Sequence, residues 1–367
     1  MLILGIETSC DETSAAIIKA TKNSKKVTLL SNIISSSLPM HSVTGGIIPE
    51  TAAREQVKYI IPVIKKALND ANVEIKDIDK IAVTYGPGLI GSLLIGVETV
   101  KTISFVYDIP LIPVNHLIGH IYANFIEQEL DLKRYTLNTD IKFPALSLIV
   151  SGGHTDLVLI RKHGDIKWLG GTRDDAAGEC FDKCARLLGF PYPGGPKIAE
   201  LAKKGNPKAF SFPRPMIGSR DHEFSFSGLK AAFLRETELH FSILRTSSNQ
   251  ISWEQITKDK TFRKTDEQTL NDLCASLQEA IISVLVSKTM KAAKKYKVKS
   301  ILVGGGVAAN ETLRKELEAS SQKLGIKFFA PAKSLCTDNG AMIASSAFFT
   351  GKQISWQKVN ADPSLYF

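Results

Sequence analysis

Apolar runs that end in polar turns occur at two distant places in the chain. Leu2 to Ile6 is a continuous apolar run, which predicts a buried strand. It ends in a turn of hydroxyl and acidic side chains, Glu7 to Ser14, and a second short strand is predicted from Ala15 to Ile18. The same order returns later as Leu146 to Val150, Ser151 to Asp156, and Leu157 to Ile160. The repeat predicts two related halves.

Each half continues with alternating helix and strand patterns. In the first half, apolar residues at helical spacing predict a helix from Thr51 to Ala71, with a kink at Pro62. Lys80 to Tyr85 predicts a buried strand, and the glycines and proline of Gly86 to Gly91 separate it from the next helix. In the second half we predict a helix over Leu273–Ala293, a strand over Ser300–Val303, a tight turn over Gly304–Gly306 and a helix starting at Asn310.

This alternation predicts an α/β protein of two lobes, with a cleft where the polar turns face each other. We expect an N-terminal lobe over residues 1–135, a C-terminal lobe over 136–345, and a tail over 346–367 that packs back on the N-terminal lobe. Residues 236–267 contain Trp253 but no clean period, so we expect a surface insertion there.

Composition places the chain among ordinary folded proteins. It has 367 residues, 44% of them hydrophobic and 23% charged, which excludes disordered and fibrous classes. The five cysteines are scattered without a CxxC pair, which is typical of a reducing compartment, and Cys180 and Cys184 are expected to pack in a core. No uninterrupted apolar run reaches ~18 residues, and the first residues carry no basic segment. We therefore expect a cytoplasmic protein without a membrane span.

The net charge of +9 is compatible with an anionic partner such as nucleic acid. The densest cationic cluster is formed by Lys288, Lys291, Lys294, Lys295, Lys297 and Lys299. It could contact phosphates or could be a solvated helix face, and the sequence leaves both open.

Three glycine turns, each following an apolar strand, favour a nucleotide-binding site. Gly152–Gly153 and Gly304–Gly306 can bring backbone N–H groups close to phosphate, because glycine has no side chain to obstruct the approach. They could also be plain strand-end turns. The chain has no GxxxxGK[ST] loop and no convincing dinucleotide fingerprint.

His116 and His120 are four residues apart, just after a predicted strand over Leu111 to Val114. On a helix both imidazoles share a face and could hold one metal ion. A zinc protease would need glutamate directly after the first histidine, but Leu117 is there, which excludes HExxH hydrolysis. The third ligand could be Asp338, Asp11 or Asp174, and spacing does not decide among them.

The segment from Asp174 to Lys183 concentrates acids at a predicted helix start. Compensation of the helix dipole accounts for Asp174 and Asp175. Asp182 lies too far inside the helix for that explanation, so we expect it to face a ligand.

Several longer motifs together identify a family. They are Gly5–Thr13 (GIETSCDET), His41–Arg54 (HSVTGGIIPETAAR), Gly86–Gly88, the His116/His120 pair, Val150–Thr155 (VSGGHT), Asp174–Lys183, Tyr192–Pro196 (YPGGP), Phe224–Lys230 (FSFSGLK), Gly304–Asn310 and Cys336–Gly340 (CTDNG). In these motifs the chain resembles, over nearly its whole length, the TsaD family of tRNA N6-adenosine threonylcarbamoyltransferases. YPGGP is more similar to the bacterial and organellar branch than to the archaeal one.

The resemblance implies the actin/hexokinase-like (ASKHA) fold of two related lobes. It implies transfer of a threonylcarbamoyl group from threonylcarbamoyladenylate to N6 of adenosine 37, with release of AMP, in tRNAs that read codons beginning with adenine. It also implies one divalent metal ion per subunit, iron(II) or zinc. Bacterial members work with a dimerising TsaB-type paralogue and a TsaE-type ATPase, whereas some mitochondrial members work alone.

The resemblance also assigns residues. His116, His120 and Asp338 match metal-binding positions. The positions that match adenylate-binding residues are Ile149, Val150, Ser151, Gly152, Gly153, Asp182, Gly195 and Asn310. Asp11 or Glu12 could assist proton removal from the amine, or could be structural acids of the turn.

Three features depart from the family pattern: Gln56 stands where histidine is common, Glu98 is an acid in a normally apolar helix, and the 236–267 region is long. Two other functions stay open, a sugar or acetate kinase on the same fold and a non-catalytic scaffold subunit. The kinase would not need the paired histidines, and the scaffold would not need complete metal and nucleotide motifs.

Overall fold

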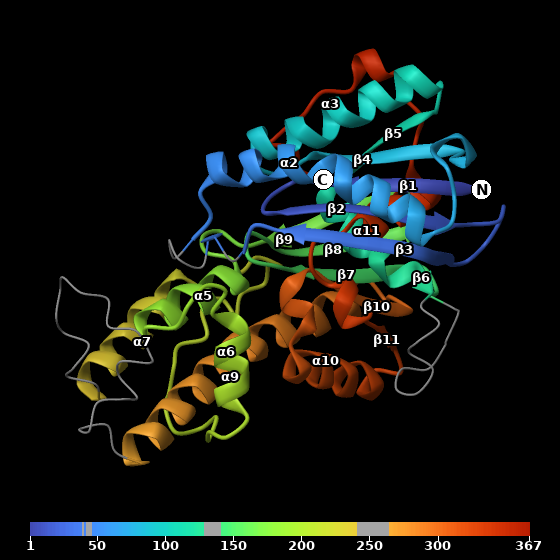
Figure 1. Ribbon diagram of the computed structural model, residues 1–367. Coiled ribbons are helices and arrows are strands. Elements are labelled where there is room, and N and C mark those ends of the chain that lie inside the picture. The colour runs from blue at the N-terminus through green and yellow to red at the C-terminus, as the bar shows by residue number, and fades with distance from the viewer. Residues whose placement is uncertain (39, 42–45, 128–140, 241–263) are drawn as a thin grey trace.

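The computed structural model describes residues 1–38, 40–41, 46–127, 141–240 and 264–367 (Figure 1). Two separate sheets form the two lobes. The first sheet, in spatial order, contains β5 (Leu111–Asn115), β4 (Lys80–Gly86), β1 (Leu2–Glu7), β2 (Glu12–Lys19), β3 (Val27–Ser36) and β6 (Ile126–Glu127). The second contains β11 (Lys327–Phe329), β10 (Ser300–Gly304), β7 (Ala145–Val150), β8 (Thr155–Lys162) and β9 (Asp165–Gly171).

The two sheets share one topology. β1, β2 and β3 form an antiparallel meander, β4 pairs parallel with β1, and β5 pairs parallel with β4. In the second sheet β7, β8 and β9 form the meander, with β10 parallel to β7 and β11 parallel to β10. The strand–polar turn–strand units expected from sequence are β1–β2 and β7–β8, at equivalent places, so the predicted two-lobed α/β architecture is confirmed.

The described helices lie around and between the sheets. They are α2 (Pro49–Asp70), α3 (Ile90–Tyr107), α4 (His116–Tyr122), α5 (Ala177–Leu187), α6 (Gly195–Ala202), α7 (Ser227–His240), α9 (Lys264–Lys295), α10 (Glu311–Lys323) and α11 (Gly340–Thr350). α2 and α3 cover the outer face of the first sheet, and α11 lies between the two sheets (Figure 1). The predicted helix over 51–71 corresponds to α2, which continues through Pro62.

Two helices join the lobes. The apolar side chains of α11 pack on β1 and β2. The contact is so close that a Cβ added at Gly5 of β1 would overlap Ala344 of α11. The short helix α4 buries Leu117 and Ile121 against Ile149 and Val158 of the second sheet. Because α4 also contacts α11, the histidines of α4 lie where the two lobes meet.

The predicted insertion over 236–267 is partly helical at its flanks. Residues 236–240 belong to α7 and residues 264–267 to α9; residues 241–263, with Trp253, lie outside the described residues. Cys180 and Cys184 are buried in the core of the second lobe, as expected.

Two of the described helices are long and apolar enough to cross a membrane by length and composition alone. In Glu267–Lys295 of α9, 72% of the apolar window is buried inside the protein, which is typical of a core helix. The corresponding share of α3 is 33%, because its inner face packs on β4 and α2 while its outer face is open.

The lysine cluster does not form one solvated face. Lys288 is 1% exposed and pairs with Asp221 at 3.1 Å, while the other five lysines are exposed. Lys299 precedes β10, whose opposite end leads into the glycine turn. A five-residue strand is about 16 Å long, so the cluster lies well away from that turn.

Candidate active site

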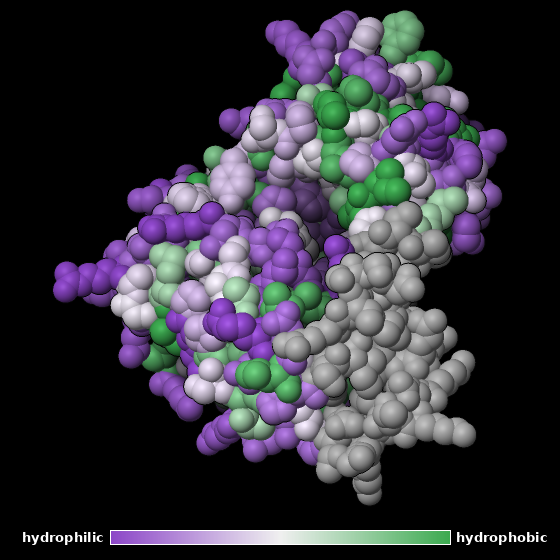
Figure 2. Space-filling model, turned by 90° about the vertical axis from the view of Figure 1, so that its left-hand side faces the viewer, coloured by the Kyte–Doolittle hydropathy of each residue, from purple (hydrophilic) through white to green (hydrophobic). Residues whose placement is uncertain are grey.

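A cleft of about 940 Å³ lies between the lobes. A cavity of this size can enclose a nucleotide. Figure 2, which looks onto the left-hand side of the view in Figure 1, shows a hollow between the upper and lower parts of the molecule. Polar turns from both lobes line it: Ser9 to Glu12 and Pro87 to Leu89 from the first, Ser151 to His154 and Gly306 to Asn310 from the second.

Three candidate metal ligands converge at one end of this cleft. Asn115 caps α4 by accepting from the N–H groups of Leu117 and Ile118, which starts the helix at His116. His116 and His120 are therefore one turn apart, with ring centroids separated by 4.7 Å. Oδ1 of Asp338, in the loop before α11, lies 3.7 Å from Nε2 of His116 and 3.3 Å from Nε2 of His120.

This arrangement fits a metal ion. Ligand atoms about 2.0–2.1 Å from a tetrahedral ion are roughly 3.3–3.4 Å from one another, close to the 3.3 and 3.7 Å between Oδ1 of Asp338 and the two Nε2 atoms. The His120 ring is fully buried, and among the described residues neither of its nitrogens makes a hydrogen bond of good geometry, although Nε2 lies 3.3 Å from Asp338. A buried nitrogen without a partner is costly, and an ion between His116, His120 and Asp338 would satisfy it. Asp338, one of three acids that spacing left open, is the one beside the histidines.

A buried carboxylate orients His116. Oε2 of Glu7 lies 3.2 Å from Nδ1 of His116, and Oγ of Ser9 is at the same distance from that nitrogen. Glu7 is fully buried and accepts a hydrogen bond from the Thr84 hydroxyl. With Nδ1 occupied by this pair, Nε2 is the atom directed at Asp338, as in other carboxylate–histidine–metal arrangements.

The charges of the cluster depend on each other. Burial alone would lower the pKa of His116, but the Asp338 and Glu7 carboxylates raise it to about 9. Burial would raise the pKa of Asp338, whereas His116 and His120 lower it to about 2. The Asp338 carboxylate is therefore stabilised by positive charge on the neighbouring imidazole of His116. A bound cation could supply this positive charge in place of the proton.

Asp11 and Glu12, the candidate proton acceptors, both line the cleft. Burial raises the pKa of Glu12, and the Asp338 and Asp11 carboxylates raise it further. The buried amide of Gln56 holds this turn from α2: it donates to the carbonyls of Cys10 at 2.9 Å and Glu12 at 3.1 Å. Gln56 is thus a structural support of the acidic turn. Glu98 is on the outer face of α3, where it pairs with Lys101.

The residues expected to bind the adenylate divide into two groups. Ser151, Gly152 and Gly153 line the cleft, while Ile149 and Val150 are fully buried in β7 and do not line it. The N–H of Ser151 donates to the carbonyl of His154 at 2.8 Å, which closes the turn. The two buried residues hold this turn in place rather than contact a ligand through their side chains.

Gly305 must be glycine for two reasons. Its φ is +93°, a conformation that side chains disfavour, and a Cβ would overlap the carbonyl oxygen of Val150. The two glycine turns of the second lobe therefore touch each other at the cleft.

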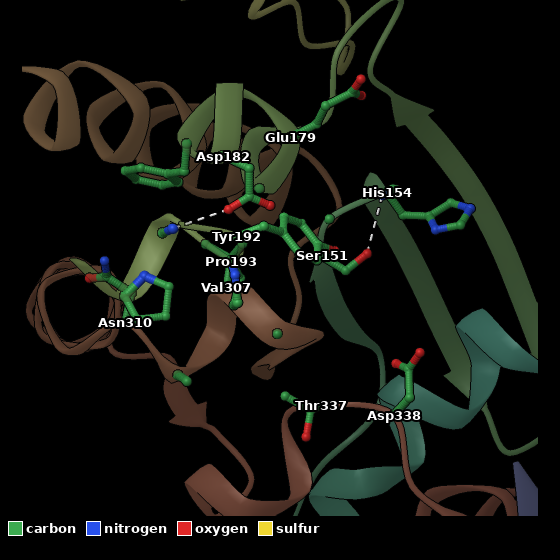
Figure 3. Close-up of a pocket in the computed structure, with 18 of the residues that line it drawn as sticks. Ser151, His154, Glu179, Asp182, Tyr192, Pro193, Val307, Asn310, Thr337 and Asp338 are labelled. Atoms are coloured by element: carbon green, nitrogen blue, oxygen red, sulfur yellow. Dashed lines mark hydrogen bonds between the residues drawn. The ribbon is translucent and has the colours of Figure 1, made fainter. Parts of the chain in front are cut away.

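Asp182 and Asn310 also line the cleft (Figure 3). Gly195 is a further lining residue. Oδ1 of Asp182 accepts from the N–H groups of Gly194 at 2.8 Å and Gly195 at 3.1 Å, so the carboxylate fixes the start of α6. Asn310 caps α10 through its side-chain oxygen and donates from its amide nitrogen to Gln278. Asn310 and Asp338 lie at different ends of the cavity in Figure 3.

Two residues of the site were not assigned from sequence. Glu7 belongs to the turn already noted, but only the register of β1 beside β4 and β5 brings it to His116. His154 lines the cleft, and burial, followed by electrostatic interaction with the imidazoles of His116 and His120, lowers its pKa to about 4. The sequence did indicate both residues in one respect, because Glu7 and His154 are each a polar residue in a strand-end turn.

Two lobes of like topology around a cleft define the chain as an actin/hexokinase-like (ASKHA) protein. A solved structure, HypF from T. kodakarensis, has the same fold over this region: the TM-score is 0.54 at 15% identity, covering 95% of this chain and 47% of that one.

Sequence comparison narrows the class to a family. Residues 28–345 match the model of the TsaD family, described as tRNA N6-adenosine threonylcarbamoyltransferase, and the chain belongs to that family. Two bacterial proteins of that name are similar over nearly their whole length. The one from Listeria welshimeri is 45% identical, over 99% of this chain and 96% of its own, and the one from Bacillus subtilis is 46% identical, over 100% and 95%.

Proposed function

We propose that this chain is an acyltransferase that moves the threonylcarbamoyl group from threonylcarbamoyladenylate to N6 of adenosine 37 in tRNA and releases AMP. Family membership supports the reaction. The observation that carries it is that His116 and Asp338, which form a cluster with the buried His120, line the same cleft as the glycine turns, so a metal ion and a nucleotide would meet there.

The reaction depends mainly on how the amine and the adenylate are positioned. The N6 amine of adenosine is a weak nucleophile because its lone pair is delocalised into the ring. The adenylate is a mixed carbamic–phosphoric anhydride, so attack at the carbamoyl carbon forms the C–N bond, breaks the C–O bond to phosphate and releases AMP. The amine loses one proton. Holding both reactants in line and stabilising the developing oxyanion supplies most of the rate in such a reaction.

The chain's own residues would divide this work. Ser151, Gly152 and Gly153 would receive the adenylate through backbone groups, with Asp182, Gly195 and Asn310 along the same cavity. His116, His120 and Asp338 would hold one divalent ion, iron(II) or zinc, whose chemistry when bound is that of a Lewis acid. Asp11 or Glu12 would accept the amine proton, since both line the cleft near Asp338.

The two alternatives are less favoured. A sugar or acetate kinase of this superfold would share the glycine turns, but it has no use for the buried histidine pair facing Asp338. A non-catalytic scaffold would not need both the ligand cluster and the nucleotide turns around an open cleft of this volume.

For partners, we propose a TsaB-type paralogue, seated on α2 and α3, together with a TsaE-type ATPase. Support for the paralogue comes from large apolar side chains on the outer side of this packed helix pair, more than about 40% exposed: Val57, Tyr59, Ile61, Ile90, Leu94, Phe105, Val106 and Tyr107. Apolar exposure on this scale is typical of a protein interface. We also propose a cytoplasmic location and the division into 1–135, 136–345 and 346–367.

The proposal is tested in a bacterial strain depleted of its own transferase. Mass spectrometry of tRNA nucleosides should show the threonylcarbamoyl nucleoside restored by this chain and not by its Asp338→Ala variant. Equal restoration by both would separate the activity from the proposed site.

A further inference from the structure

Residues 362–367 run between the lobes and contact both. On the first lobe, the N–H of Asp362 donates to the carbonyl of Tyr85 at 2.7 Å, and the N–H of Gly88 donates to the carbonyl of Pro363 at 3.5 Å. A Cβ at Gly86 would overlap the carbonyl oxygen of Asp362, so the segment lies directly on this turn.

Tyr366 continues the segment onto the second lobe. Its hydroxyl donates to Oδ1 of Asp156 at 2.5 Å, and the indole N–H of Trp168 donates to the same oxygen at 2.9 Å. The rings of Tyr366 and Trp168 meet edge to face, with centroids 6.0 Å apart. The Asp156 residue is 1% exposed, so this carboxylate is a buried anchor.

Tyr366 also contacts the start of the histidine helix. Its carbonyl oxygen accepts from Nδ2 of Asn115 at 3.2 Å, and Oδ1 of that asparagine caps α4. One residue of the tail thus joins α4, a strand of the second lobe and, through residues 362–363, the first lobe.

The two ends of this segment lie beside the turns that line the cleft from its two lobes. Tyr85 leads into the lining turn Pro87–Leu89. Asp156 is two residues beyond His154, and it pairs with Ile149 in the ladder that closes the lining turn 151–154. The five residues from Asp362 to Tyr366 therefore link one turn to the other, held at each end by hydrogen bonds.

We propose that residues 362–366 act as a strap that fixes the separation of these two walls, and that Tyr366 is a positioning residue for nucleotide binding. The choice of nucleotide rests on the proposed function. A ligand that touches both walls binds best when their separation is already set, because it then does not have to order them. Without the Tyr366 hydroxyl the two walls move more freely, and the nucleotide binds more weakly because its binding must also restrain them.

The test compares Tyr366→Phe, which removes only the hydroxyl, with Trp168→Phe, which removes the other donor to Asp156 but keeps an aromatic ring beside Tyr366. Tyr296→Phe, just beyond the C-terminal end of α9, is the background control. Calorimetry with AMP should give a Kd about five- to tenfold higher for Tyr366→Phe, which is the size of the net contribution of one ordinary hydrogen bond, and within about twofold of wild type for the other two. Equal weakening in Tyr366→Phe and Trp168→Phe would overturn the strap, because the effect would then come from Asp156 alone.

A ligand-free measurement separates this proposal from the proposed function. Hydrogen exchange of peptides covering 86–89 and 151–156 should be several-fold faster in Tyr366→Phe than in Trp168→Phe, at unchanged melting temperature. If wild type fails to bind AMP, the nucleotide function is wrong and exchange alone decides the strap. Unchanged exchange in both peptides would contradict it.

Discussion

Oε2 of Glu7 lies 3.2 Å from Nδ1 of His116, and the opposite nitrogen of that ring faces Asp338. The carboxylate comes from the end of β1 and the histidine from the start of α4, which are 109 residues apart in sequence. The pairing fixes which imidazole nitrogen is offered to the cleft.

Glu7→Gln should weaken metal binding although Glu7 is not itself a ligand. The amide keeps the size of the side chain but loses the negative charge that supports the His116 imidazole. Loss of such a supporting partner typically costs about 10–100-fold in metal affinity. A competition titration with zinc measures the metal affinity of this variant. Glu50→Gln, in the exposed first turn of α2, is the matched control. Equal affinities in the two variants would show that Glu7 only packs.

Asp338→Asn and His120→Ala should each lose bound metal. The asparagine keeps the shape of the ligand but removes its charge, and the alanine removes one of two imidazoles. Elemental analysis of the purified proteins measures the metal content, with the exposed His240→Ala as control. Full metal content in both site variants would place the ion elsewhere or nowhere.

Asp182→Ala should weaken binding of a non-hydrolysable adenylate analogue by about tenfold, because it removes an acceptor bonded to two backbone N–H groups at the start of α6. Asp182→Asn, which retains an acceptor oxygen, should bind more tightly than the alanine variant. Calorimetry distinguishes the two. An unchanged affinity in Asp182→Ala would remove Asp182 from the binding site.

Cations at the cleft should matter more for tRNA than the lysines near β10. Lys203 and Lys333 line the cleft, and both approach Glu311. Replacing both by alanine should weaken tRNA binding and reduce the slope of log K against log salt by about 0.7–0.9 per lost phosphate contact. The same change at Lys294 and Lys299 should have little effect. A larger effect at the second pair would move the tRNA contact to the far end of the sheet.

Much of the fold follows from local pattern. The apolar runs of β1 and β7 are continuous and end at polar turns, so these strands were predicted close to their observed bounds. The His116/His120 pair follows from helical spacing in the same way. The choice of Asp338 over Asp11 and Asp174 depends on how α11 docks between the sheets, and local spacing carries no such information.

Long-range contacts also explain what the sequence did not reveal. Lys288 belongs to a run of lysines, yet it is buried because the loop carrying Ser219 and Asp221 packs over that face of α9 and supplies its acceptors. The tail was expected on the first lobe, but its contact with Asp156 depends on the side chain of one tyrosine. Neither contact leaves a periodic signal in the chain.

The central claim is transfer of the acyl group to tRNA from an adenylate held in this cleft. The most direct measurement supplies threonylcarbamoyladenylate, labelled in its threonine, and unmodified tRNA to the purified chain, in an extract of a depleted strain that provides any helper proteins. The labelled nucleoside is quantified by mass spectrometry, and the AMP released in the same reaction is quantified in parallel. We predict one labelled threonylcarbamoyladenosine for each tRNA-dependent AMP, and neither product with the His120→Ala variant. AMP release without labelled nucleoside, or a labelled nucleoside at wild-type yield in His120→Ala, would contradict the account.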